Sequence, residues 1–195
     1  MPCFLDSGPF GMLLTAVDRK ILPPEVLTES LLSPVTACEL ARHTPKLRIM
    51  REFSSFLRPL TRQHSRVIGE LEWGPEFVAE LTSKGTDYFR GKLDAMHARC
   101  VMYPPFLDLH LSRYGENPPK TITGSKRYTS DVRDSMQLLI SRDIPFITFD
   151  WDLMKKLPPK MPCHVVPCSR EGKPELVLAA VRIANAGMFT ADKWQ

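Results

Sequence analysis

The fold class is predicted by residues 130–150, which read SDVRDSMQLLISRDIPFITFD. The first part of this stretch carries apolar residues at the spacing of one helical face, which predicts a helix with a single buried stripe. The stripe consists of Val132, Met136, Leu139 and Ile140. We expect Ser130 to cap this helix and the acids Asp131 and Asp134 to lie in its first turn, where the helix dipole favours negative charge.

The run PFITF at residues 145–149 is almost continuously apolar, which is typical of a strand covered on both faces in a parallel sheet. It ends at Asp150. A second short apolar run, PCFL at residues 2–5, ends in the same way at Asp6. Two further candidate strands lie at residues 31–36 and 164–166.

Helices are expected between these strands. Apolar stripes at helical spacing predict them at residues 46–60 and 89–100, and a closing helix is expected at 175–186. Residues 113–128 are rich in glycine, proline and basic side chains and predict a long, locally basic loop. Short apolar strands that alternate with helices are typical of an α/β fold with a mainly parallel sheet.

Length and composition exclude several classes of protein. A chain of 195 residues favours one domain, or one domain with an appendage. Its longest apolar runs are only a few residues, far short of the roughly 20 that a membrane-spanning helix needs, and no signal-peptide pattern opens the chain. Five scattered cysteines fit a reducing cytoplasm better than a disulfide framework. The net charge of +4 permits nucleic-acid binding without requiring it.

Acidic residues follow the two best-defined strands. Asp6 and Asp150 stand at the carboxyl ends of these strands, where open α/β sheets bind their ligands. Asp131 begins the helix that leads into the second strand and can reach the same edge of the sheet. Carboxylates gathered there repel one another unless a cation neutralises them, and Mg²⁺ prefers oxygen ligands of this kind. Each acid also has a purely structural explanation as a cap or turn residue, and the residues alone leave both interpretations open.

Two segments carry a resemblance to a known family. FLDSGPF at residues 4–10 resembles the opening strand and turn of the PIN-domain ribonucleases, which include the toxins of VapBC-type toxin–antitoxin pairs. Residues 129–153 are similar to the C-terminal half-motif of that family, in which an aspartate begins a helix and a later strand ends in Thr-x-Asp. The resemblance implies a three-layer α/β/α fold around a central, mainly parallel sheet. It frames a nuclease domain at residues 1–168, expanded at about 60–125, and leaves residues 169–195 as a helical appendage.

The family also needs a glutamate after its second strand, and two positions match. SPVTACEL at residues 33–40 offers Glu39, and HSRVIGEL at residues 64–71 offers Glu70. We favour Glu39, because its distance from Asp6 is typical of the family, whereas Glu70 requires an unusually long insertion. Glu70 stays open as the alternative.

The resemblance implies a Mg²⁺- or Mn²⁺-dependent endoribonuclease. The implied metal ligands are Asp6, Glu39, Asp131 and Asp150, with Glu70, Asp134 and Asp152 as less certain ones. Ser7 and Thr148 are expected to orient these carboxylates or a water molecule. The basic loop supplies candidate contacts to RNA phosphates, namely Lys120, Lys126 and Arg127. The family further implies a cognate antitoxin protein and a homodimer as partners.

Two other functions compete with this interpretation. The chain can be a PIN-like module that binds RNA or a protein without cleaving it, although the presence of all four acids argues against this. It can also be a phosphatase-type hydrolase that uses Asp150 as nucleophile and Asp152 as acid, but no downstream lysine motif supports that chemistry.

Overall fold

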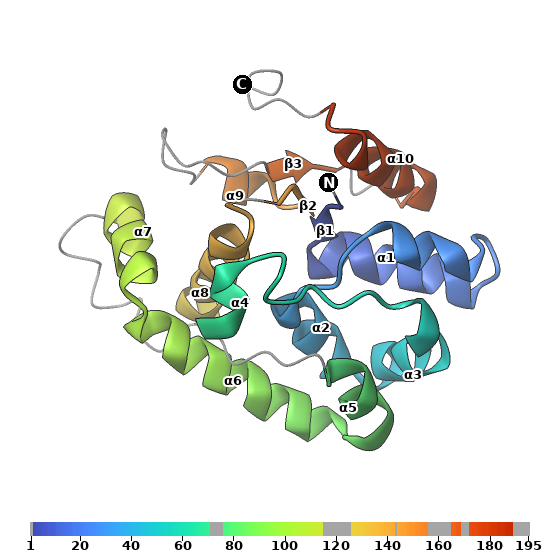
Figure 1. Cartoon of the computed structure of the whole chain (residues 1–195), viewed down its shortest axis with the longest axis horizontal. Helices are drawn as coiled ribbons and strands as arrows, with labels where there is room; N and C mark the ends of the chain where they lie inside the picture. Colours follow the sequence, from blue (N-terminus) through green and yellow to red (C-terminus); the bar gives the residue numbers. More distant parts are fainter. Residues whose placement is uncertain are drawn as a thin grey trace.

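The computed structural model describes residues 2–70, 76–114, 126–142, 144–155, 165–168 and 172–188. A small parallel sheet lies among many helices (Figure 1). Its strands are β1 (Phe4–Leu5), β2 (Phe146–Thr148) and β3 (Val165–Pro167), in the spatial order β1-β2-β3. Phe4 pairs with Phe146, and Phe146 pairs with Val165, both in parallel register. The predicted α/β class with a parallel sheet is therefore confirmed, although helices make up most of the chain.

Isolated bridges continue the sheet beyond β1. Leu31 forms a parallel bridge with Phe4, and Leu32 forms a parallel bridge with Pro59. The strand predicted at 31–36 is limited to these two residues, because Pro34 opens helix α2 (Pro34–Ala41) and the Ser33 side chain caps it. Proline is pre-organised for the first turn of a helix, and serine is a favoured cap, so both residues end the extended segment.

The order of the strands creates a topological switch point, at which the chain changes the side of β1 on which it adds strands. From β1 the chain first lays the segments at Leu31 and Pro59 on one side, and it then returns to place β2 and β3 on the other side. In open parallel sheets such a point, here between β1 and β2, is where ligands bind outside the carboxyl ends of the strands.

Helices pack around this sheet (Figure 1). Besides α2 and two 3₁₀ turns, η1 (Pro24–Glu29) and η2 (Ser54–Phe56), these helices are α1 (Ser7–Asp18), α3 (Thr44–Glu52), α4 (Arg66–Glu70), α5 (Phe77–Ser83), α6 (Thr86–Met102), α7 (Pro104–Tyr114), α8 (Lys126–Ile140), α9 (Trp151–Lys155) and α10 (Pro174–Asn185). Of these, α3, α5 and α6 lie farther from the sheet, in a part of the molecule that contains helices alone among the described residues (Figure 1). None of the described helices is long and apolar enough to cross a membrane.

The apolar stripes of two predicted helices are buried as expected. In α6 the stripe of Phe89, Leu93, Met96 and Cys100 packs into the core, and α6 lies against α2. The stripe of α8 is likewise buried. The helix predicted at 46–60 is wrong in its last part, because α3 ends at Glu52 and only η2 follows. Pro59 disfavours helical backbone at Arg58, which limits the helix on that side.

Helix α8 begins earlier than its sequence pattern predicts. It starts at Lys126, so Ser130 lies inside the helix and not at its cap, and Asp131 and Asp134 lie beyond the first turn. No proline or glycine interrupts residues 126–130, which explains why the helix extends toward the amino end. The predicted loop at 113–128 is shortened at both ends by α7 and α8, and its central residues 115–125 lie outside the described residues.

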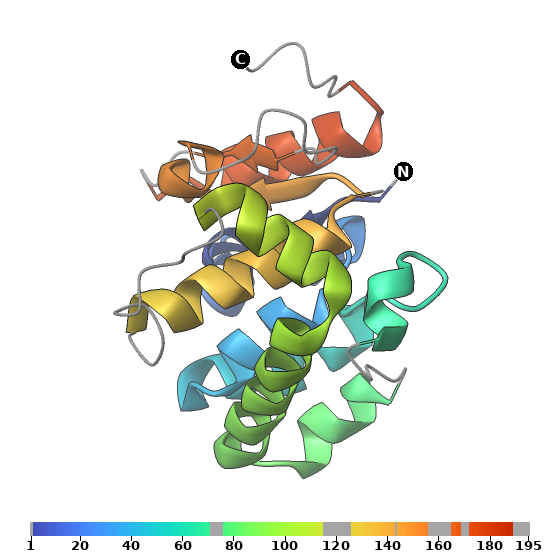
Figure 2. The same cartoon turned by 90° about the vertical axis from the view of Figure 1, so that its left-hand side faces the viewer.

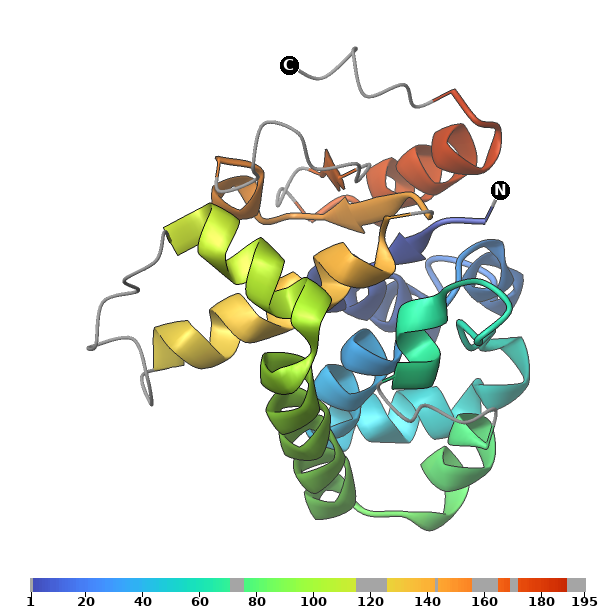
Figure 3. The same ribbon diagram turned by 60° about the vertical axis from the view of Figure 1, so that its left-hand side comes forward.

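Helices α8 and α10 lie on opposite sides of the strands (Figures 2 and 3). α10 is tied to the start of the chain, because Asn185 accepts a hydrogen bond from the Cys3 main-chain nitrogen at 2.9 Å and donates to the Glu29 carbonyl at 2.6 Å. Arg182 forms a bidentate ion pair with the Glu29 carboxylate at 2.8 and 2.9 Å. The region predicted as an appendage thus contains a helix that shares the core of the sheet.

Candidate acidic site at the carboxyl edge of the sheet

Asp6 connects β1 to α1 and stands directly at the switch point. Its Oδ1 accepts a hydrogen bond from the Ser7 main-chain nitrogen at 2.7 Å, so Asp6 caps α1. The main-chain nitrogen of Asp6 donates to Ile147 of β2 at 2.9 Å. Ser7, Gly8 and Pro9 therefore form the first turn of a helix rather than the separate turn that their composition suggests.

Thr148 joins the ends of the two central strands. Its side chain is fully buried, and its hydroxyl donates to Asp6 Oδ2 at 2.8 Å. The same hydroxyl oxygen accepts a hydrogen bond from the Asp150 main-chain nitrogen at 3.0 Å. One threonine thus fixes the orientation of the Asp6 carboxylate and the start of the segment that carries Asp150.

Asp150 follows β2 and caps α9. Its Oδ1 accepts hydrogen bonds from the main-chain nitrogens of Asp152 at 2.8 Å and Leu153 at 3.2 Å. One oxygen of the Asp150 carboxylate, Oδ1, therefore has the purely structural role of capping a helix. Oδ2 of Asp150 accepts no hydrogen bond from the described residues. Asp152 itself is exposed in the first turn of α9.

The charges of Asp6 and Asp150 act on each other. Burial raises the pKa of Asp6 above its usual value, and the nearby Asp150 carboxylate raises it further, while hydrogen bonds from Thr148 and Ser7 act in the opposite direction. A neighbouring negative charge disfavours the ionised form of a carboxyl group in this way. Carboxylates of two neighbouring strands therefore meet at the edge where the sequence predicts a site.

Glu39 approaches the same cluster from α2. Burial raises its pKa, and the charge of Asp6 raises it further, whereas Arg133 and a hydrogen bond from the Ser7 hydroxyl lower it. Arg133 of α8 forms an ion pair with Glu39, with 3.6 Å between Nη1 and Oε1. Asp6, Asp150 and Glu39 thus form a coupled set of charges, called the acidic cluster below, and Arg133 is its internal cation.

A buried polar network holds α2 and α8 against β1. The Ser33 hydroxyl donates to Gln137 Oε1 at 2.9 Å, and Gln137 Nε2 donates to the Thr36 hydroxyl at 2.8 Å. Thr36 in turn donates to the Leu5 carbonyl at 2.7 Å. Because Thr36 lies one turn before Glu39 on α2, and Gln137 one turn after Arg133 on α8, this network positions the ion pair relative to the end of β1.

The remaining predicted site residues take different places. Asp131 is buried on α8, where its main-chain oxygen accepts a hydrogen bond from Ser135 at 2.7 Å, and Asp134 is half-buried. The α8 side chain that meets Glu39 is Arg133, and residues two apart on a helix do not face the same way. Across the described part of the chain, no three His, Cys, Asp or Glu side chains are placed to hold one metal ion together.

Four other predicted residues cannot be placed in the site. Lys120 lies outside the described residues. Lys126 and Arg127 fall in the first turn of α8 and Glu70 ends α4, but their side chains lie outside the described part of the structure.

Sequence reasoning missed Arg133 and the network of Ser33, Thr36 and Gln137. A basic residue between two predicted site acids is the signal that points to Arg133 in retrospect. For the network, a serine directly before a proline and a glutamine inside an otherwise apolar stripe are the visible signs.

Comparison of the chain with protein-family models, with curated proteins and with solved structures finds no match. The acidic cluster is therefore interpreted from its own chemistry.

The donor set of the acidic cluster fits a hard divalent cation. Mg²⁺ is commonly held by one or two carboxylates while water fills its other positions. An ionised carboxylate has about four lone-pair sites, and Asp6 uses two of them for Ser7 and Thr148. Asp6 and the open Oδ2 of Asp150 have the capacity to bind one cation.

Proposed function

We propose that this chain is a Mg²⁺- or Mn²⁺-dependent ribonuclease of PIN-like, three-layer architecture. The observation that carries the proposal is the meeting of Asp6 and Asp150 at the switch point of a parallel sheet, joined by Thr148. Like charges held close together at such a point repel each other unless a cation neutralises them. The resemblance of residues 4–10 and 129–153 to PIN-domain ribonucleases supports the same chemistry.

Each residue of the acidic cluster has a role in this proposal. Asp6 and Asp150 would hold the cation, and Thr148 would keep the Asp6 carboxylate in place. Glu39 would orient a water molecule beside the scissile phosphate, and its raised pKa suits it to exchange a proton with that water. A bound divalent cation supplies a lowered pKa of water and stabilises charge on the leaving oxygen.

The proposed substrate is single-stranded or looped RNA, whose backbone is accessible to a shallow site. Asp131, with Asp134 and Asp152 as further acids, stays a proposed contributor to metal binding on the strength of the resemblance, and Glu70 stays the alternative to Glu39. The same holds for the contacts of Lys120, Lys126 and Arg127 to phosphate. A cognate antitoxin and a homodimer are likewise proposals that rest on the family alone, and a cytoplasmic location is a proposal that rests on the five scattered cysteines.

One observation favours a second candidate function. The ion pair between Arg133 and Glu39 places a cation of the protein itself beside the acidic cluster. If that guanidinium replaces the metal permanently, the chain is a PIN-like module that binds RNA or a protein and does not cleave.

A cleavage assay separates the two candidates. The purified chain is incubated with a panel of labelled RNAs, with Mn²⁺ or with a chelator. We expect cleavage in Mn²⁺ alone, at least 100-fold slower in Asp150→Asn. Asp87→Asn, which changes an exposed acid of α6, serves as the matched control and should cleave like the wild type. Binding of RNA without cleavage by the wild type would support the non-catalytic module and reject the nuclease.

The choice of glutamate has its own test. Glu39→Gln should abolish cleavage, and Glu70→Gln should leave it intact. The opposite pattern would transfer the role to Glu70.

A further inference from the structure

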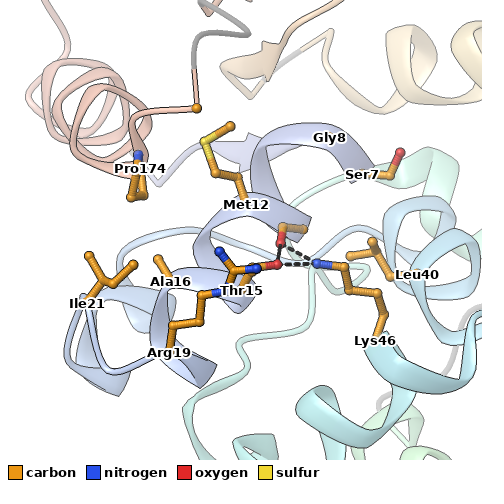
Figure 4. A pocket seen from close by; sticks show the side chains of 12 residues that line it. Ser7, Gly8, Met12, Thr15, Ala16, Arg19, Ile21, Leu40, Lys46 and Pro174 are labelled. Carbon is orange, nitrogen blue, oxygen red and sulfur yellow. Dashed lines mark hydrogen bonds between the residues drawn. The ribbon is translucent and has the colours of Figure 1, made fainter.

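A cavity of about 430 Å³ lies along one face of α1 and is also lined by residues of α2, α3 and α10 (Figure 4). The helix face from Ser7 to Arg19 forms its floor. Lys46 of α3 lies on one side of this floor, and Pro174 of α10 closes the other. Cavities that bind small ligands in proteins have volumes of about 300–1,000 Å³, so this one is large enough for a nucleotide.

Two cations face this cavity. The Lys46 ammonium donates to the Gly11 carbonyl at 2.6 Å and also to the Thr15 hydroxyl. Because an ammonium group has three donors, one remains for a ligand. The Arg19 guanidinium is exposed and has no hydrogen-bond partner among the described residues.

The two cations are close enough to influence each other. Burial lowers the pKa of Lys46, and the charge of Arg19 lowers it as well, while Asp18 acts against both. Asp18 is itself paired with Arg48 at 2.8 Å. The cavity thus holds more positive than negative charge, which complements a phosphate group.

The rest of the wall is apolar. Met12 is half-buried, Ile21 is 55% exposed, and both line the cavity together with Pro174. An apolar surface next to two cations matches the two parts of a nucleotide, because a base packs on apolar side chains while its phosphate contacts lysine or arginine.

The cavity borders the acidic cluster at Ser7. Ser7 lines the cavity and also donates its main-chain N–H to Asp6. Glycines at positions 8 and 11 let neighbouring side chains pack closely on this part of α1: a Cβ at Gly11 would lie 3.2 Å from Leu40 Cδ2, and one at Gly8 would lie 3.0 Å from Phe149 Cδ2. Lys46 contacts Gly11, about 6 Å along the helix axis beyond Ser7.

We propose that this cavity binds a nucleotide of single-stranded RNA adjacent to the scissile phosphate, with its phosphate on Lys46 and Arg19 and its base on the apolar wall. The inference rests on the proposed function, because it takes the acidic cluster as the place where the strand is cut.

The test measures RNA binding separately from cleavage. Fluorescence anisotropy of a labelled single-stranded oligonucleotide is recorded in chelator, in an Asp150→Asn background, over a range of salt concentrations. Arg19→Gln is compared with Lys20→Gln, an adjacent exposed cation that does not line the cavity. The salt slope is the slope of the logarithm of the binding constant against the logarithm of the salt concentration. For single strands, one lost phosphate contact reduces its magnitude by about 0.7, which corresponds to about fivefold weaker binding at 0.1 M salt. We expect this change for Arg19→Gln and for Lys46→Met, and none for Lys20→Gln.

Each outcome decides the proposal. Equal salt slopes for Arg19→Gln and Lys20→Gln would overturn it, even if the wild type cleaves RNA. A reduced slope for Arg19→Gln in a chain that cleaves no RNA would keep the nucleotide site and reject the nuclease. Adenosine monophosphate is added as competitor: if it displaces the oligonucleotide at equal concentration, the site takes free mononucleotides and the strand proposal fails.

Discussion

Replacing Thr148 with valine tests the hydroxyl that joins the two central strands. Valine keeps the shape and the strand preference of threonine but removes the hydroxyl. The variant loses the bond to Asp6 Oδ2 at 2.8 Å and the bond from the Asp150 nitrogen at 3.0 Å. A hydrogen bond to a charged group contributes about 1.5–3 kcal/mol, and a neutral one about 0.5–1.5 kcal/mol. We therefore expect the free energy of unfolding to fall by about 2–4 kcal/mol at pH 7.

The assay is urea denaturation followed by far-UV circular dichroism, with Thr148→Ser as the matched control. Serine keeps the hydroxyl and loses one buried methyl group, so it should cost only about 1 kcal/mol. A double-mutant cycle with Asp6→Asn isolates the Thr148–Asp6 pair, for which contacting residues show coupling energies of about 0.5–3 kcal/mol. If Thr148→Val is as stable as the wild type, or if the coupling is zero, the hydroxyl does not join the strands and the reasoning fails.

Two further predictions concern α2 and α8. The pKa of Glu39 is raised above its usual 4.5, so the folded protein binds this proton more tightly than the unfolded chain, and stability is lost as the pH rises through the folded pKa. Glu39→Gln should escape that loss, so in urea titrations its free energy of unfolding should rise relative to that of the wild type as the pH increases above 4.5. A difference between the two proteins that stays constant, or that shifts in favour of the wild type with rising pH, would contradict this. Gln137→Leu should lower the free energy of unfolding by about 1–3 kcal/mol, because it removes two buried hydrogen bonds, one to Ser33 and one to Thr36, each of which contributes about 0.5–1.5 kcal/mol. A calorimetric midpoint equal to that of the wild type would remove the network from the account.

The central sheet is predictable from the sequence because its strands are fully buried. Continuous apolar runs at 2–5 and 145–149 have no competing helical period, so they identify β1 and β2 directly. The positions of Asp6 and Asp150 then follow from the rule that parallel strands bring their carboxyl ends to one edge. The burial of the α6 and α8 stripes is likewise predictable, because their apolar residues recur at the spacing of one helical face.

The errors have local physical causes. The segment at 31–36 is apolar enough for a strand. The capping bond of Ser33 and the fixed backbone of Pro34 nevertheless favour a helix from Pro34 onward. Composition alone does not show which of the two preferences is stronger. The start of α8 is missed because Ser130 is a good cap by type, while nothing before it breaks a helix. The partnership of Arg133 and Glu39 joins residues 94 positions apart, which depends on tertiary packing and on no local pattern.

The most direct test of the acidic cluster is a titration of the purified chain with Mn²⁺, in which free Mn²⁺ is followed by electron paramagnetic resonance. Asp6 and Asp150 are the proposed ligands, so we expect one site in the wild type and in Asp87→Asn, with affinity reduced at least tenfold in Asp150→Asn and in Asp6→Asn. Removal of a ligating carboxylate has this effect because the cation prefers charged oxygen donors. Equal Mn²⁺ binding by all four proteins, or none by the wild type, would contradict the account.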